Sequence, residues 1–125
     1  MRSLNSRRTE PAVRIDWQFQ RNGESRVAGA SVTFGSGARS AWHTRSLGQM
    51  LIVTSGTGWT QCEGGPIVEI NVGDIIGCPA NHRHWHGATP TTAMTHIAVQ
   101  EAMGGKVVER MEKVTDEACL AGPTP

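Results

Sequence analysis

The histidines of this chain are concentrated in one part of the sequence. All five lie between residues 43 and 96, and His43 is followed within seven residues by Arg45 and Gln49. Side chains alternate across a β-strand, so a strand through this stretch would place His43 and Arg45 on one face. Neutral imidazoles bind transition metals, and an amide oxygen such as that of Gln49 can complete a coordination shell. This stretch is therefore a candidate metal site.

A second cluster, HRHWH at residues 82–86, contains three more histidines at alternate positions. His84 and His86 would point to the same side of a strand and could face one cavity. An imidazole titrates near neutral pH, so one ring could bind a metal while the other transfers a proton. A single histidine beside a tryptophan is more often structural, and we expect His82 in a solvent-exposed loop. The two clusters together favour a site.

Short apolar runs separated by turn residues predict an all-β domain. The chain holds 15 Gly and 6 Pro, and residues 13–19 alternate between apolar and polar, as in a half-buried strand. We predict a hairpin turn over residues 55–58, and a short C-terminal helix with Thr115 as its N-cap. Roughly ten short strands indicate an antiparallel jelly-roll barrel or sandwich. The mouth of a small barrel is a natural ligand site.

The length of 125 residues fits one domain. We predict a disordered tail over residues 1–11, a folded domain over 12–118 and a C-terminal tail over 119–125. A formal net charge of +1 does not suggest a nucleic-acid or membrane partner. Three cysteines without a CxxC pair, and the lack of a signal-like or membrane-length apolar run, lead us to expect a cytoplasmic protein with reduced thiols.

Two motifs resemble those of the cupin superfamily. The first cupin motif is a glycine, a His-x-His pair, a carboxylate or glutamine and a second glycine, and its spacing is matched here by Gly37, His43, Gln49 and Gly56.

The second cupin motif is matched by Gly73, Pro79 and His84, while Asn81 and Ala88 stand where it has Gly and Asn. The stretches WHTRSLGQMLIVTSGTGW and HWHGATPTTAMTHIAVQE further resemble the small bacterial cupins of the hydroxynitrile lyase type. Those enzymes bind manganese or iron and split cyanohydrins such as mandelonitrile into an aldehyde and hydrogen cyanide. The resemblance extends over roughly residues 12–118 and implies a cupin jelly roll.

The resemblance implies that His43, Gln49 and His84 are metal ligands, with manganese or iron expected and zinc as a further candidate. The second ligand histidine of the family is Arg45 here. Arginine keeps its proton and cannot ligate, and its charge weakens the binding of a dication. Three ligands can still hold a metal. Alternatively the metal is lost and Arg45 itself stabilises developing negative charge.

The resemblance also places other residues in the same cavity. Five residues match family positions that line this cavity: His86, His96, Ala30, Val32 and Gln100. In a lyase, His86 or His96 would take the proton from the substrate hydroxyl, and the other three would line the substrate pocket. Strand alternation puts His96 and Gln100 on one face but does not say which face is inward; the resemblance favours inward.

Three functions follow from these observations. The first is a cupin lyase of the hydroxynitrile lyase type. The second is a cyclase, isomerase, dehydratase or decarboxylase acting on an anionic or polyketide-like molecule, with Arg45 as an anion clamp. The third is a cupin that binds a small ligand without catalysis. We also expect a homodimer that buries Trp42, Met50 and Ile52, which lie opposite the candidate site.

Overall fold

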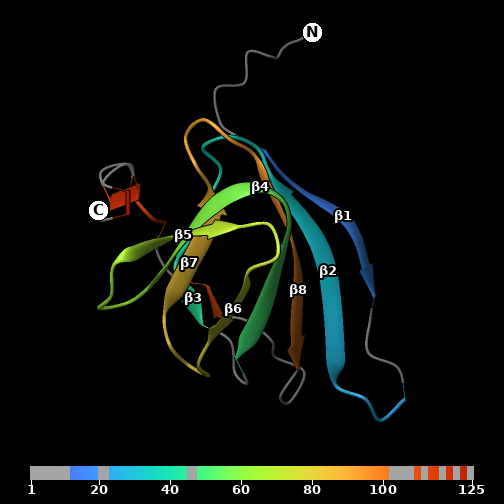
Figure 1. The fold of residues 1–125 in the computed structure, drawn as a ribbon. Helices are drawn as coiled ribbons and strands as arrows, with labels where there is room; N and C mark the ends of the chain where they lie inside the picture. Colours follow the sequence, from blue (N-terminus) through green and yellow to red (C-terminus); the bar gives the residue numbers. More distant parts are fainter. Residues whose placement is uncertain are drawn as a thin grey trace, which may run out of the picture.

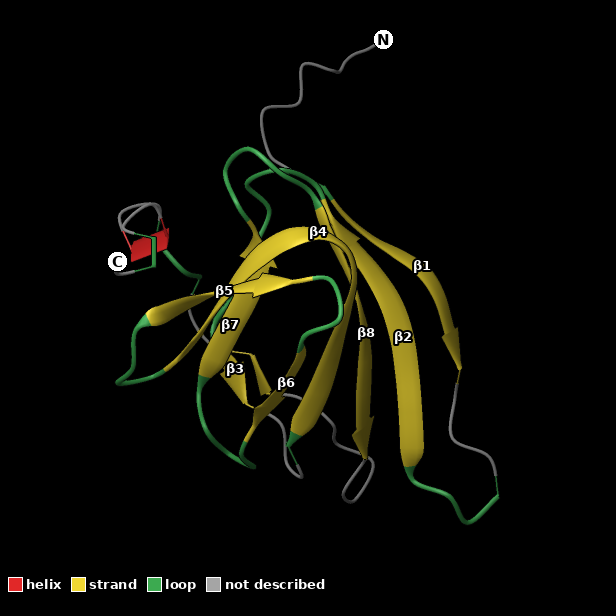
Figure 2. Ribbon diagram, in the orientation of Figure 1, coloured by secondary structure: helices red, strands yellow, loops and turns green. Residues whose placement is uncertain are grey.

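The structure is a computed structural model, and it describes residues 12–19, 23–44, 48–101, 109–110, 113–115, 118–119 and 122–123. Strands dominate this part of the chain (Figures 1 and 2). They are β1 (Val13–Phe19), β2 (Val27–Phe34), β3 (His43–Thr44), β4 (Gln49–Cys62), β5 (Ile67–Asn71), β6 (Ile75–Cys78), β7 (His84–Ala88), β8 (Met94–Glu101) and β9 (Glu109–Arg110). In these ranges no helix is long and apolar enough to cross a membrane.

The strands form one curled antiparallel sheet. Its order is β1-β2-β8-β4-β7-β3-β9, and β5 and β6 also pair with β4. The first half of β4 pairs with β8 and β6, and its second half pairs with β5 and β7. Figure 1 shows β4 arching from one side of the molecule to the other. This arrangement confirms the predicted all-β antiparallel fold and brings β8 and β7 to opposite walls of one interior.

The corner of β4 corrects the predicted hairpin at residues 55–58, because the strand runs through these residues without a turn. Gly56 has φ +76°, and a Cβ atom there would lie 2.0 Å from the carbonyl oxygen of Ala93. The register with β8 shifts between Val53 and Ser55. Glycine supplies the positive φ and the close approach that this bend requires. The glycines therefore bend one strand rather than reverse the chain.

Strand β1 forms at the predicted residues but is more exposed than the half-buried strand we expected. Its four apolar side chains are 46–60% exposed. A bulge at Asp16 shifts the register, so that Ile15 pairs with Val32 but Trp17 pairs with Ser31. Since directly paired residues share a face, the bulge sends the apolar side chains before and after it to opposite faces. β1 is also the edge of the sheet, with no strand beyond it among the described residues.

Two clusters of buried residues form the core. One contains Phe34, Ala38, Val53, Ile70, Ala88 and Met94; the other contains Ile67, Trp85, Val114 and Cys119. Trp85 is fully buried, and its indole N–H donates a hydrogen bond to Gln61 Oε1 at 2.8 Å. Trp42 packs against the second cluster and lies under the Arg83 guanidinium, at 4.7 Å from the ring centroid. It is therefore separate from the sheet face that Met50 and Ile52 share.

The C-terminal part of the described chain begins a helical turn at Thr115. The Thr115 hydroxyl accepts a hydrogen bond from the Ala118 N–H at 3.0 Å, and the Thr115 carbonyl accepts one from the Cys119 N–H at 3.0 Å. These are the contacts of an N-cap and of a first helical turn. Cys119 is buried in the core, one residue into the segment that the sequence assigns to the tail. Residues 116–117, 120–121 and 124–125 lie outside the described ranges, as does the predicted tail at residues 1–11.

Candidate metal centre

Strand β7 carries two histidines into the interior of the curled sheet. His84 and His86 are 2% and 4% exposed, and His84 pairs directly with His43 of β3, which is also buried. The alternation of side chains along a strand explains why both β7 rings face the same side. The structure thus brings His43 next to a pair of residues that lies about forty positions later in the sequence.

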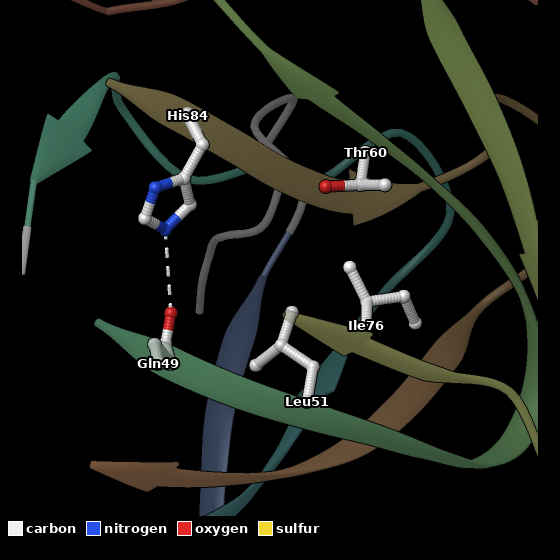
Figure 3. Close-up of a pocket in the computed structure, with 5 residues that line it drawn as sticks. All are labelled: Gln49, Leu51, Thr60, Ile76 and His84. Carbon is white, nitrogen blue, oxygen red and sulfur yellow. Dashed lines mark hydrogen bonds between the residues drawn. The ribbon is translucent and has the colours of Figure 1, made fainter. Parts of the chain in front are cut away.

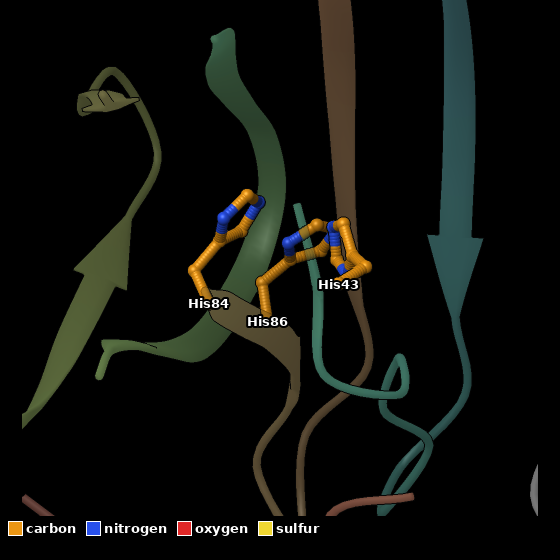
Figure 4. Close-up of side chains that lie close together, drawn as sticks. All are labelled: His43, His84 and His86. Carbon is orange, nitrogen blue, oxygen red and sulfur yellow. The ribbon is translucent and has the colours of Figure 1, made fainter. Parts of the chain in front are cut away.

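The three rings lie close enough to act on one ion. One ring nitrogen from each of His43, His84 and His86 lies within 4.8 Å of the others. The ring centroid of His43 is 4.2 Å from that of His84 and 5.3 Å from that of His86. Figure 4 shows the three rings gathered between β7 and β3.

Gln49, the first residue of β4, reaches the same point from the opposite wall. Its side chain is buried, and its Oε1 lies 3.4 Å from His84 Nε2 (Figure 3). Its Nε2 donates a hydrogen bond to Gln100 Oε1 at 3.4 Å. Gln100 therefore orients the Gln49 amide so that its oxygen faces the histidines.

Backbone carbonyls fix the protonation of two of these rings. The Nδ1–H of His43 donates to the Ala41 carbonyl at 2.8 Å, and the Nδ1–H of His84 donates to the His82 carbonyl at 3.0 Å. A carbonyl oxygen only accepts, so in the neutral rings the lone pair is on Nε2. In metal-binding histidines, a hydrogen bond of this kind from the ring nitrogen that does not bind the metal orients the ring.

The contact between His84 and Gln49 has a chemical consequence. A neutral His84 presents its Nε2 lone pair to Gln49 Oε1, which is itself an acceptor. With the amide held in this orientation, the contact is favourable when the ring carries a second proton or when a cation binds both atoms. Imidazole nitrogens and an amide oxygen are suitable donors for a divalent transition metal. The residues present therefore fit a metal ion.

His96 approaches the three rings from β8. It is 1% exposed, and its ring centroid is 4.9 Å from that of His86 and 5.5 Å from that of Phe34. Met94, His96 and Ala98 are buried, whereas the residues between them are partly exposed. The alternation in the sequence did not show which face of β8 points inward. In the structure it is the face that carries His96.

The three residues expected to line a substrate pocket lie on that inward wall. Val32 pairs with His96, Ala30 pairs with Ala98, and Gln100 pairs with Gln49. All three are partly buried. The predicted proton acceptor and the predicted pocket residues are therefore neighbours across β2, β8 and β4.

A narrow gap, too small for a water molecule, lies beside Gln49 and His84. It is lined by Gln49, Leu51, Thr60, Ile76 and His84 (Figure 3). Three of these residues were missed in the sequence. Leu51 could have been found, because it alternates with Gln49 on β4. Thr60 and Ile76 come from the far half of β4 and from β6, and nothing local in the sequence marks them.

Two other residues were singled out in the sequence, His82 and Arg45. His82 is exposed, as expected, and its ring nitrogen Nε2 donates to the Glu63 carbonyl at 3.2 Å. Arg45 lies outside the described residues, so its predicted place beside the ligands stays a prediction.

Comparisons with known proteins agree with this geometry. Residues 30–99 match the family described as Cupin domain. The chain is 60% identical over 105 residues to an (R)-mandelonitrile lyase from Granulicella tundricola, covering 84% of this chain and 80% of that protein.

Solved structures give the same result for the fold. A cupin-like protein from Thermotoga maritima has a TM-score of 0.80 and 33% identity, covering 89% of this chain and 83% of that one. A DMSP lyase from Ruegeria pomeroyi has a TM-score of 0.69 at 14% identity, covering 90% of this chain and 58% of that one, so its likeness concerns the fold alone. The curled antiparallel sheet, the matched residues and the relatives together show that this chain belongs to the cupin family.

Proposed function

We propose that this protein is a metal-dependent hydroxynitrile lyase that cleaves a cyanohydrin into an aldehyde and hydrogen cyanide. The observation that carries the proposal is the convergence of His43, His84 and Gln49 inside a cupin sheet, in a chain 60% identical to an (R)-mandelonitrile lyase. Aromatic cyanohydrins such as mandelonitrile are the substrate class that we propose first.

The metal would be held by His43, Gln49 and His84, with manganese or iron as the expected ion and zinc as a further candidate. A bound divalent ion supplies Lewis-acid stabilisation of negative charge on the substrate oxygen. Gln100 keeps the Gln49 oxygen turned toward the site through its hydrogen bond to the amide nitrogen. The Ala41 and His82 carbonyls hold the two imidazoles in the tautomer that ligation requires.

His86 or His96 would remove the proton from the substrate hydroxyl group. As the O–H pair becomes the new C=O bond, the C–C bond breaks and its electron pair leaves with cyanide. The imidazolium then returns the proton to cyanide, which leaves as HCN, so the step balances without an oxidant or reductant. Ala30, Val32 and Gln100 would line the space that receives the leaving group.

His96 is packed against Phe34 on the inward wall and is almost inaccessible to solvent. The gap beside Gln49 and His84 is lined by two apolar side chains, Leu51 and Ile76.

The test is benzaldehyde formation from (R)- and (S)-mandelonitrile by metal-loaded protein, followed by absorbance and corrected for the uncatalysed rate. Faster cleavage of the (R) enantiomer is expected, in keeping with the relative's name. No release above the uncatalysed rate from either enantiomer, with metal bound, would contradict the proposal.

Arg45 favours a second candidate function, a cyclase, isomerase, dehydratase or decarboxylase that acts on an anionic or polyketide-like substrate. A guanidinium can bind a carboxylate or an enolate. Arg45→His distinguishes the two functions: the lyase predicts tighter metal binding and faster cyanohydrin cleavage, whereas the anion clamp predicts the loss of a native activity on a carboxylate or enolisable ketone. A purely ligand-binding cupin would show no turnover that any histidine substitution changes.

We also propose that the protein is a homodimer in the cytoplasm. Register pairs place seven apolar residues on the sheet face opposite the site, here called the outer face: Trp17, Phe19, Met50, Ile52, Ile75, Ile97 and Val99. An apolar patch of this kind marks a protein contact, and a twofold pairing would cover it on both chains at once. Trp42, expected in this interface, packs elsewhere. The cytoplasmic location is supported by three cysteines without a disulfide or zinc spacing.

A further inference from the structure

The ligand set of the proposed function has one histidine fewer than the family pattern implies. Position 45 is an arginine, which cannot ligate. We infer that His86 supplies the missing imidazole, so that the metal shell of this chain is His43, His84, His86 and Gln49. This inference rests on the proposed function in one respect: both require that the protein binds a metal.

The position of His86 on β7 supports this assignment. A His-x-His pair on a strand points both rings to one side, and this is the arrangement that the family places at positions 43 and 45. In this chain the same pair occurs at His84 and His86, both buried. The chelating pair has moved from the first motif to the second, and the number of imidazoles stays at three.

The distances between the rings also fit one ion. Two nitrogens that bind one ion tetrahedrally at about 2.1 Å lie about 3.4 Å apart. The three ring nitrogens already lie within 4.8 Å of one another. Side-chain rotations that close the largest gap by at most about 1.4 Å would therefore bring the three nitrogens to binding distance.

His86 and His96 differ in their distance from the other two rings. Among the described residues, the group of side chains that could hold an ion contains His86 but does not contain His96. The ring centroid of His96 lies 4.9 Å from that of His86, and Phe34 packs against both rings, at 5.5 Å from His96 and 5.6 Å from His86. The sequence left open whether His86 or His96 takes the proton from the substrate. With His86 bound to the metal, His96 takes this proton.

The donor set also sets the choice of metal. Three imidazoles and one amide carry no charge, and nitrogen ligands favour the later divalent metals over manganese and magnesium. We expect cobalt, nickel or zinc to bind more tightly than manganese, whichever ion the protein holds in the cell.

Calorimetric titration of the metal-free full chain with CoCl₂ alone tests the inference. The wild type should bind one equivalent of cobalt. His86→Ala should weaken cobalt binding by about tenfold to hundredfold or more, because a loss of that size is seen even for residues that only hydrogen-bond to a ligand. His96→Gln should bind cobalt within about threefold of the wild type, as should the matched control His82→Ala, which removes an exposed ring from the same stretch. Circular dichroism checks that each metal-free variant is folded.

A rescue variant keeps the test decisive if the His86→Ala protein does not fold. Arg45→His restores a histidine at the family position, so Arg45→His/His86→Ala should recover cobalt binding to within about tenfold of the wild type. Cobalt also reports its own coordination, because the intensity of its visible absorption changes with ligand number and geometry. The wild type and the rescue variant should give similar intensities, and His86→Ala a different one.

Two results would overturn the inference: a wild type that binds no cobalt, or a His86→Ala variant that binds it as tightly as the wild type. The proposed function is separable from it. If cobalt binding depends on His86 but the loaded protein does not release benzaldehyde from mandelonitrile, the ligand assignment stands and the lyase proposal fails. If benzaldehyde is released and His86→Ala binds metal normally, the reverse holds.

Discussion

In the proposed mechanism, His96 is the residue on which proton transfer depends. It is almost fully buried and lies beside His86 and Phe34, so a substitution there can alter proton transfer without altering the surface. We predict that His96→Gln, which keeps a polar side chain of similar reach, lowers kcat for mandelonitrile cleavage about 10²- to 10⁴-fold. The thermal midpoint and the cobalt affinity should stay close to those of the wild type. Unchanged kcat would remove His96 from the mechanism.

The site residues divide into those that local sequence reveals and those that it does not. His84 and His86 alternate on one strand, so their shared face follows from the strand period alone. The pairing of His84 with His43, and the approach of Gln49 to His84 Nε2, depend on the order of strands in the sheet. Only the resemblance to cupins could supply that order in advance. Thr60 was missed because it lies beyond the bend in β4, and Ile76 because it reaches the site through pairing with Leu51 of β4.

Among the strands, β4 is the one whose course was predicted wrongly from the sequence. A Ser-Gly-Thr-Gly run is typical of a turn, and the same glycine properties serve a strand corner. What decides between the two is the Ala93 carbonyl packed against Gly56, which belongs to a distant segment. Similarly, the alternation over residues 13–19 predicts the strand but not the bulge that divides its apolar side chains between two faces.

We predict that Gly56→Ala destabilises the protein by about 3 kcal/mol or more. A left-handed φ costs a residue other than glycine about 1–2 kcal/mol, and a Cβ 2.0 Å from a carbonyl oxygen adds the cost of moving backbone. Gly73→Ala is the matched control, since it has φ +93° but no heavy atom within 4 Å of the added Cβ. Gly73→Ala should therefore lose only the stability that the left-handed φ costs. Equal losses in urea denaturation would contradict this account of the corner.

The bulged strand β1 carries a titratable group whose behaviour can be checked. The hydroxyl of Thr33, followed by the guanidinium of Arg14, donates hydrogen bonds to the Asp16 carboxylate and lowers its pKa below the ordinary value. Because the folded pKa is the lower one, the resulting stabilisation is present above the unfolded pKa. It is lost as the pH falls through the folded value.

Thr33→Val removes the largest cause of this shift while keeping the shape of the side chain. The pKa of Asp16 should rise toward its ordinary value, measured by carbon NMR of the side-chain carboxyl over a pH series. Arg14→Gln should raise it less, since Arg14 is the second cause. An Asp16 pKa that is the same in all three proteins would show that these contacts do not form in solution.

At the scale of the whole molecule, the curled sheet has one face that encloses the site and another that is exposed. Met50 and Ile75 are 46% and 66% exposed on the outer face, an unfavourable position for large apolar side chains in an isolated chain. We predict that the wild type sediments as a dimer at micromolar concentration and that Ile75→Lys sediments as a monomer. Val72→Lys, at an equally exposed residue outside the outer face, should remain a dimer. A monomeric wild type would refute the pairing.

We propose that a metal ion in this interior makes the chain a cyanohydrin-cleaving enzyme. The most direct measurement is the rate of benzaldehyde release from (R)-mandelonitrile, plotted against the number of metal ions bound per chain as determined by elemental analysis. We predict a rate close to the uncatalysed one after chelation, rising in proportion to occupancy and levelling near one ion per chain. Full activity in the chelated protein, or no activity at full occupancy, would contradict it.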